Sequence, residues 1–79
     1  MRVRFFAGAA EAAGVDEITV DAQGLTVADV VARLGRGNRH LAEVLEASSL
    51  LADGACVRDR AVSALGVGQL DVLPPFAGG

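Results

Sequence analysis

The stretch MRVRFF, residues 1–6, alternates two kinds of side chain along an extended chain. One face carries Met1, Val3 and Phe5, and the other carries Arg2, Arg4 and Phe6. This period of two predicts a half-buried β-strand, and DEITVD at residues 16–21 repeats it. Because residues 8–15 between them are few and mostly small, we expect an antiparallel hairpin with a loose loop. In such a pair the arginines of one strand can face the acids of the other.

The middle of the chain changes to a helical period. Apolar residues recur at helical spacing at Val27, Val30, Val31 and Leu34. Thr26 and Asp29 resemble a capping box, so we expect a helix over residues 26–34. Asn38 can cap a second helical stretch that ends at about residue 47. The apolar stripe of that stretch is Leu41, Val44 and Leu45.

The last third returns to strand patterns. Candidate strands are LLAD at residues 50–53, ACVRD at 55–59 and LDVLP at 70–74, with a turn signal at Asp53 and Gly54. This order of elements predicts an α+β fold in which one mixed sheet packs on one side against the helix. Pro74 and Pro75 cannot donate to a strand ladder. We therefore expect one domain over residues 1–75 and a flexible C-terminal diglycine tail over residues 76–79.

The composition excludes several classes of protein. The 79 residues carry a net charge of -3, and the seven basic residues are scattered arginines, which argues against a nucleic-acid partner. No apolar run approaches the roughly 18 residues of a membrane span, so we expect no membrane partner. One Cys and one His supply neither a disulfide framework nor a zinc ligand set. A reducing cytoplasm fits best.

The side chains that usually carry chemistry form no active-site pattern. His40 is the only histidine and fits an ordinary surface position, and Cys56 fits a buried or half-buried small thiol. The remaining candidate is the C-terminal carboxylate of Gly79. Gly78 and Gly79 lack Cβ atoms and can pass through a channel too narrow for other residues. Phe76 beside them would be exposed unless a partner buried it.

The opening FFA…EAAG, the second half from residue 50 and above all the ending PPFAGG resemble a known family. They are similar to the small subunit of molybdopterin synthase, a MoaD/ThiS-type sulfur carrier. The resemblance covers nearly the whole chain and implies the ubiquitin-like β-grasp fold. Relatives often carry a Val-Asn pair at a turn where this chain has Ala52 and Asp53.

The resemblance also implies a mechanism centred on Gly79. A ubiquitin-activating-like adenylating enzyme would use ATP to adenylate its carboxylate, and sulfur from a donor protein would displace AMP to give a thiocarboxylate. The thiocarboxylate would donate sulfur to the pterin precursor inside the large subunit of molybdopterin synthase, for molybdenum cofactor biosynthesis. The chain would be a carrier without a bound cofactor, and the large subunit would supply the catalytic side chains. The inserting tail would be Pro74, Pro75, Phe76, Ala77, Gly78 and Gly79.

Alternation along the first and last strands predicts a docking surface. If Val3 and Phe5 point at the helix, Phe6 points to the open face of the sheet, and Leu73 does the same on the last strand. These two strands are neighbours in a β-grasp, so Phe6 and Leu73 would form an exposed apolar patch beside the tail. The competing interpretation is that Phe6 simply leans onto loop residues.

Three other functions compete with the molybdopterin synthase carrier. The first is the same chemistry for thiamine, cysteine or another thio-product. The second is a ubiquitin-like modifier joined through Gly79 to target lysines. The third is a plain interaction domain in which Gly78 and Gly79 are incidental. The sequence leaves the sulfur donor and the stoichiometry of the complex open.

Overall fold

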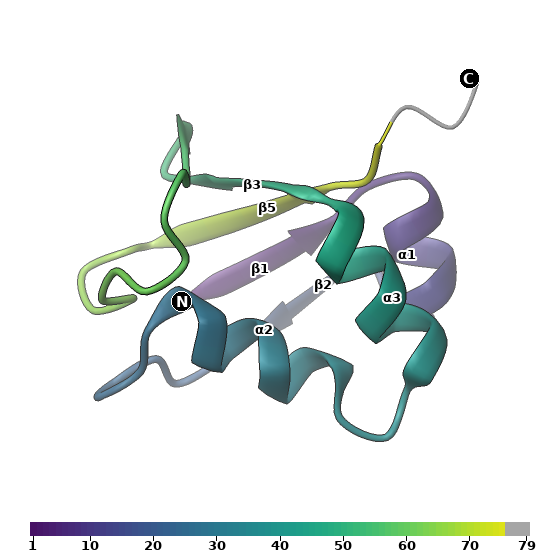
Figure 1. Ribbon diagram of the computed structural model, residues 1–79, viewed down its shortest axis with the longest axis horizontal. Coiled ribbons are helices and arrows are strands. Elements are labelled where there is room, and N and C mark those ends of the chain that lie inside the picture. The colour runs from purple at the N-terminus through teal and green to yellow at the C-terminus, as the bar shows by residue number, and fades with distance from the viewer. Residues whose placement is uncertain (76–79) are drawn as a thin grey trace.

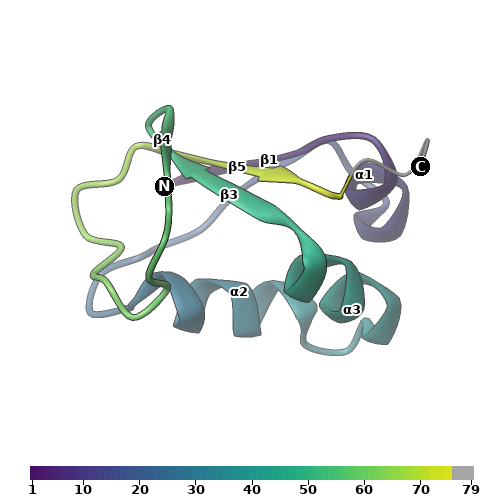
Figure 2. The same ribbon diagram turned by 45° about the horizontal axis from the view of Figure 1, so that its top comes forward.

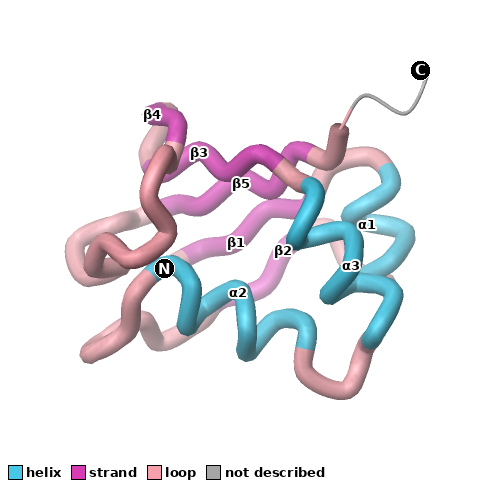
Figure 3. The backbone as a smooth tube through the Cα atoms, viewed as in Figure 1, coloured by secondary structure: helices cyan, strands magenta, loops and turns pink. Residues whose placement is uncertain are grey.

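The computed structural model describes residues 1–75, so the predicted tail of residues 76–79 lies outside the described residues. Its sheet has five strands in the order β2-β1-β5-β3-β4 (Figure 1). The strands are β1 (Arg2–Phe5), β2 (Glu17–Thr19), β3 (Ser49–Ala52), β4 (Ala55–Cys56) and β5 (Gln69–Leu73). The helices are α1 (Gly8–Ala13), α2 (Val27–Gly35) and α3 (Arg39–Ala47) (Figure 3). Within the described part, no helix has the length and apolar character needed to cross a bilayer.

The sheet is mixed, as predicted, because the central strand β5 and its neighbour β1 are parallel while the other pairs are antiparallel. β1 pairs in parallel with β5, and each also pairs antiparallel with its other neighbour, β2 for β1 and β3 for β5. Helices α2 and α3 lie on one side of the sheet and leave the other side open (Figure 2). This arrangement confirms the predicted α+β fold with a sheet packed on one side against helix.

The core lies between the sheet and the helices. Alternate residues of the central strands are buried, namely Val3 and Phe5 on β1 and Leu70 and Val72 on β5. Val27, Val30, Leu41 and Leu45 of α2 and α3 meet them in the same cluster. Burial of each such large apolar side chain stabilises the fold by about 1.5–3 kcal/mol. The two periods in the sequence therefore identified the residues that hold the layers together.

The prediction of a loose loop over residues 8–15 is wrong, because Gly8–Ala13 form the helix α1. The run is rich in alanine, the residue with the highest helix propensity, and Ala9 is fully buried. Gly14 ends the helix in the left-handed conformation, and its N–H donates to the Ala10 carbonyl. The Asn38 side-chain amide donates to the Ala12 carbonyl over 2.9 Å. This bond ties α1 to the start of α3.

The two predicted helix caps are confirmed. Thr26 Oγ1 accepts from the Asp29 amide at 3.0 Å, and Asp29 Oδ2 accepts from the Thr26 amide at 2.9 Å, which completes the capping box of α2. Asn38 Oδ1 accepts from the Leu41 amide at 3.0 Å and caps α3. Both helices therefore begin one residue after the cap that the sequence indicates.

Replacement of Thr26 by alanine should lower the free energy of unfolding by about 1 kcal/mol, because one amide of α2 loses its acceptor. Urea denaturation at neutral pH measures this change. The conservative substitution Thr26→Ser keeps the hydroxyl and should lose much less. Equal losses in the two variants would mean that the side chain acts through its methyl group and not through the cap.

Asp29 should make the stability of α2 depend on pH. Its pKa lies below the usual 3.8, mainly because of the hydrogen bond from the Thr26 backbone and then the bond with the Thr26 side chain. A lowered folded-state pKa gives a contribution that is present above the unfolded-state pKa and is lost as the pH falls through the folded-state value. Asp29→Asn should therefore be less stable than the wild type at pH 7, and the difference should shrink below about pH 4. The matched control is Asp16→Asn.

The turn at Asp53 and Gly54 is confirmed, and it also fixes the start of β5. Both residues have positive φ, +48° and +85°, and they join β3 to the short β4, which ends at Cys56 and not at the predicted residue 59. The Asp53 carboxylate accepts from the amides of Gly68 and Gln69. Nearer the start of the connection between β4 and β5, the Arg60 guanidinium donates to the carbonyl of Leu45 in α3 and to the carbonyl of Ser48, the residue that follows α3.

Candidate functional site

The candidate site begins where β5 leaves the centre of the sheet. β5 has β1 on one side and β3 on the other, with Val72 opposite both Phe5 and Leu50. The Phe6 amide donates to the Val72 carbonyl over 3.2 Å, so the pairing with the first strand continues past β1. The position of Pro74 is therefore fixed by two neighbouring strands. Pro74 is half-buried and Pro75 is exposed.

Phe6 and Leu73 lie side by side at this exit. The parallel register pairs Phe5 with Val72, which places the next residues, Phe6 and Leu73, at the same level. Both are half-buried, whereas Phe5 and Val72 are buried against the helices. The Arg4 guanidinium lies over the Phe6 ring, 5.0 Å from its centroid, which puts Phe6 on the open face with Arg4. The docking role of this patch stays a prediction.

Two ion pairs lie on the open face along β1. Arg2 lies 3.6 Å from the Glu17 carboxylate and Arg4 lies 4.0 Å from the Asp71 carboxylate. Arg2 also donates to Gln69 Oε1 over 3.1 Å. The first pair bears out the expectation that arginines of the first strand face acids of the second. Surface ion pairs contribute only about 0–1 kcal/mol each, so these pairs mainly set the charge pattern around the apolar patch.

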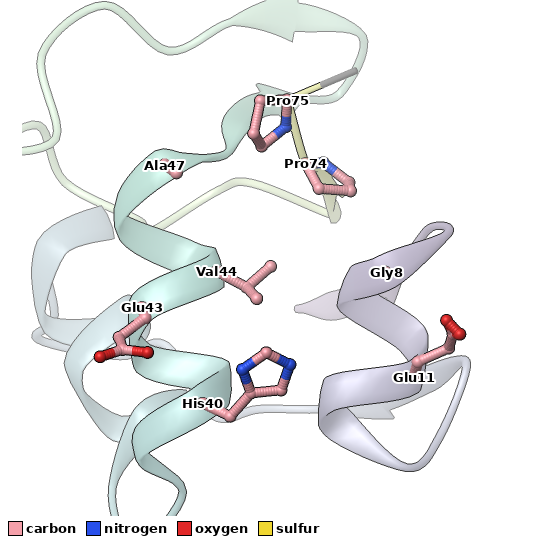
Figure 4. Close-up of a pocket in the computed structure, with 8 residues that line it drawn as sticks. All are labelled: Gly8, Glu11, His40, Glu43, Val44, Ala47, Pro74 and Pro75. Atoms are coloured by element: carbon pink, nitrogen blue, oxygen red, sulfur yellow. The ribbon is translucent and has the colours of Figure 1, made fainter. Parts of the chain in front are cut away.

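A groove lies on the helix side of the same exit (Figure 4). It has a volume of about 390 Å³ and is bounded by α1, by α3 and by the two prolines. Its apolar lining consists of Gly8, Val44, Ala47, Pro74 and Pro75, and its polar lining consists of Glu11, His40 and Glu43. His40 and Val44 point from α3 toward α1, while Glu11 and Glu43 stand at the two outer margins with their carboxylates directed away from the gap between the helices (Figure 4).

Of the other candidate side chains, the structure places Cys56 apart from this exit and His40 in the lining of the groove. Cys56 is exposed on β4, which corrects the expectation of a buried or half-buried thiol. It is exposed because β4 is an edge strand and its register with Leu51 puts the thiol on the open face. His40 is exposed, as expected. Phe76, Ala77, Gly78 and Gly79 lie outside the described residues.

The described residues offer no set of three His, Cys, Asp or Glu side chains that could hold a metal ion. The feature that sequence reasoning missed is the groove. Its walls belong to helices far apart in the chain, and one of them, α1, was expected to be a loop. The alanine-rich run over residues 8–13 was the signal that could have revealed that wall.

Comparison with known proteins identifies a family for the chain. The model of the ThiS family matches residues 3–79. No curated protein sequence matches the chain. The solution structure of the Haloferax volcanii HVO 2177 protein is 33% identical, with a TM-score of 0.75 over 99% of this chain and 84% of that one.

Two crystal structures from the same organism show the same fold at lower identity. SAMP1 from Haloferax volcanii is 24% identical, with a TM-score of 0.76 over 99% of this chain and 97% of that one. A second structure, of H. volcanii small archaeal modifier protein 1, is 23% identical, with a TM-score of 0.72 over 94% of each chain.

Proposed function

This chain belongs to the ThiS family, and from that premise we propose that it is a sulfur carrier whose reactive group is the Gly79 carboxylate. One observation carries the proposal. The central strand β5 leads without a break into Pro74 and Pro75, so the sheet holds the start of the segment that ends in the two glycines. A reactive group on such a segment has a fixed origin and a short reach. Such tethering favours delivery into a partner's active site.

The proposed chemistry takes place at the carboxylate and uses ATP that the activating enzyme binds. The Gly79 carboxylate attacks the α-phosphorus of ATP, which gives the acyl adenylate and releases pyrophosphate. A sulfur nucleophile from the donor protein then attacks the acyl carbon, and AMP leaves. When the donor is a persulfide, a thiol must reduce the resulting acyl disulfide to release the thiocarboxylate. None of these steps requires a side chain of the carrier, in keeping with a non-catalytic role.

We further propose that the acceptor is the pterin precursor of the molybdenum cofactor, bound in the large subunit of molybdopterin synthase. The ending PPFAGG supports this choice. The patch of Phe6 and Leu73 supports it as well, because a partner that receives the segment after Pro75 must lie against the exit of β5. The sulfur atom would then be positioned by the docked domain, and the large subunit would supply the acid and base groups.

Two other acceptors follow from the same activated carboxylate. A small thio-product such as thiamine or cysteine requires a different large partner and the same carrier. A lysine of a target protein would make the chain a modifier, and similarity to the structure of H. volcanii small archaeal modifier protein 1 favours this second candidate. The chain contains no lysine, so it offers no side-chain amine for conjugation to itself.

The proposed function is tested by intact-mass analysis of the carrier after incubation with ATP, its native activating enzyme and a sulfur source. We expect a mass increase that corresponds to exchange of one oxygen for sulfur. The increase should require ATP and should disappear when the activating enzyme is omitted. No change with an enzyme of demonstrated activity would contradict the carrier function.

A second experiment then uses the thiocarboxylated carrier to identify the acceptor of the sulfur. Loss of the sulfur mass on addition of the large subunit and the pterin precursor would support molybdopterin synthase. A stable conjugate of higher mass in cells, linked through Gly79 to lysine, would support the modifier. Retention of function after deletion of Gly78 and Gly79 would contradict both and leave a plain interaction domain.

A further inference from the structure

The groove between α1 and α3 has the surface chemistry of a protein-binding site. Its floor is apolar, with Val44 and Ala47 on α3 and the rings of Pro74 and Pro75 above them (Figure 4). Glu11 stands at the α1 margin and Glu43 at the α3 margin. Among the described residues, neither carboxylate has a cationic partner within 4.0 Å, since the two ion pairs there involve Glu17 and Asp71. The groove therefore has an apolar floor and two acidic margins, and the His40 imidazole points into it from α3.

The position of the groove determines which molecule can reach it. Pro75 lines it, and Pro75 is also the last described residue before the segment that ends at Gly79. A protein that takes this segment into its own active site must lie within a few residues of the groove, because each residue spans at most about 3.6 Å. The patch of Phe6 and Leu73 lies on the opposite, open side of the same strand end. Such a partner can therefore contact the exit of β5 on both sides.

On the basis of the proposed function, we propose that the groove binds the adenylating enzyme through an apolar side chain flanked by lysine or arginine. The apolar side chain fills the floor against Val44 and the prolines, and the cations lie beside Glu11 and Glu43. The net charge of -3 adds a general attraction for a basic surface. Adenylation is common to every acceptor considered above, so this partner is needed whichever acceptor is used. The acidic margins make the contact specific for a basic segment.

The test compares ATP–pyrophosphate exchange by the native activating enzyme with the wild-type carrier and with the double variant Glu11→Gln/Glu43→Gln. The KM for the carrier should rise roughly three- to tenfold, because each exposed ion pair contributes a small amount. The kcat should stay the same, because the carboxylate that reacts is unchanged. The wild-type KM should also rise more steeply with salt than that of the variant.

The matched control is Asp21→Asn/Glu46→Gln, which removes the same charge from exposed positions outside the groove. Its KM should stay close to that of the wild type. Equal KM values for the groove variant and the wild type would overturn the groove contact while leaving the proposed function intact. An effect confined to sulfur transfer to the acceptor protein would also overturn it, because the adenylating enzyme would not be the occupant. Absence of exchange with the wild-type carrier would instead contradict the proposed function.

Discussion

A chain that lacks Gly79 should form thiocarboxylate at least about a thousandfold more slowly than the full chain, although its new end is again a glycine carboxylate. The deletion shortens the reach from Pro75 by about 3.3–3.6 Å. A misplacement of about 1 Å at a reacting centre can already cost about a hundredfold in rate. Initial rates of ATP–pyrophosphate exchange and intact mass measure the loss.

The shortened chain should still bind its activating enzyme. The folded domain and the exit of β5 are unchanged, so it should inhibit adenylation of the wild-type carrier with a Ki within about threefold of the wild-type KM. A loss of thiocarboxylate formation with unchanged binding would show that the deletion affects the position of the carboxylate and not the affinity for the enzyme. Thiocarboxylate formation on Gly78 at nearly the wild-type rate would contradict the proposal that the position of the carboxylate is decisive.

Much of the fold could be predicted because its local and global signals agree. The period-two pattern at Val3 and Phe5 and the caps at Thr26 and Asn38 each correspond to an observed element. The helix α1 was missed because a run of six small residues between two strands resembles a loop. An isolated helix of this length is only marginally stable in water. Its stability comes from burial of Ala9 and contact with α3, which are tertiary effects.

The candidate site was predictable only where it depends on strand register. Alternation placed Phe6 and Leu73 on one face, and the parallel pairing of β1 with β5 brings them together. The exposure of Cys56 depends on the shortness of β4 and its place at the sheet edge, which no local pattern reveals. The groove depends on the packing of α1 against α3, which is a contact between distant parts of the sequence.

Substitution of Phe6 by aspartate should raise the KM of the activating enzyme for the carrier roughly thirty- to a hundredfold. Burial of a large apolar side chain at an interface contributes about 1.5–3 kcal/mol, and a buried carboxylate would add a desolvation cost. The free energy of unfolding should fall by only about 1 kcal/mol, from loss of the Arg4 contact and of partial burial. Titration of the variant carrier in the exchange assay gives KM, and urea denaturation gives stability.

The matched control for this substitution is Leu65→Asp. Leu65 is 69% exposed in the connection before β5 and lies in neither the patch nor the groove, so its replacement introduces the same charge at an apolar surface position. Its KM should change less than about twofold, because a distant surface charge is screened by salt. An unfolded Phe6→Asp protein would show that Phe6 belongs to the core. A folded variant with an unchanged KM would show that the enzyme docks elsewhere. A raised KM in a folded Phe6→Asp protein, with Leu65→Asp unaffected, is the result that a partner on the open face requires.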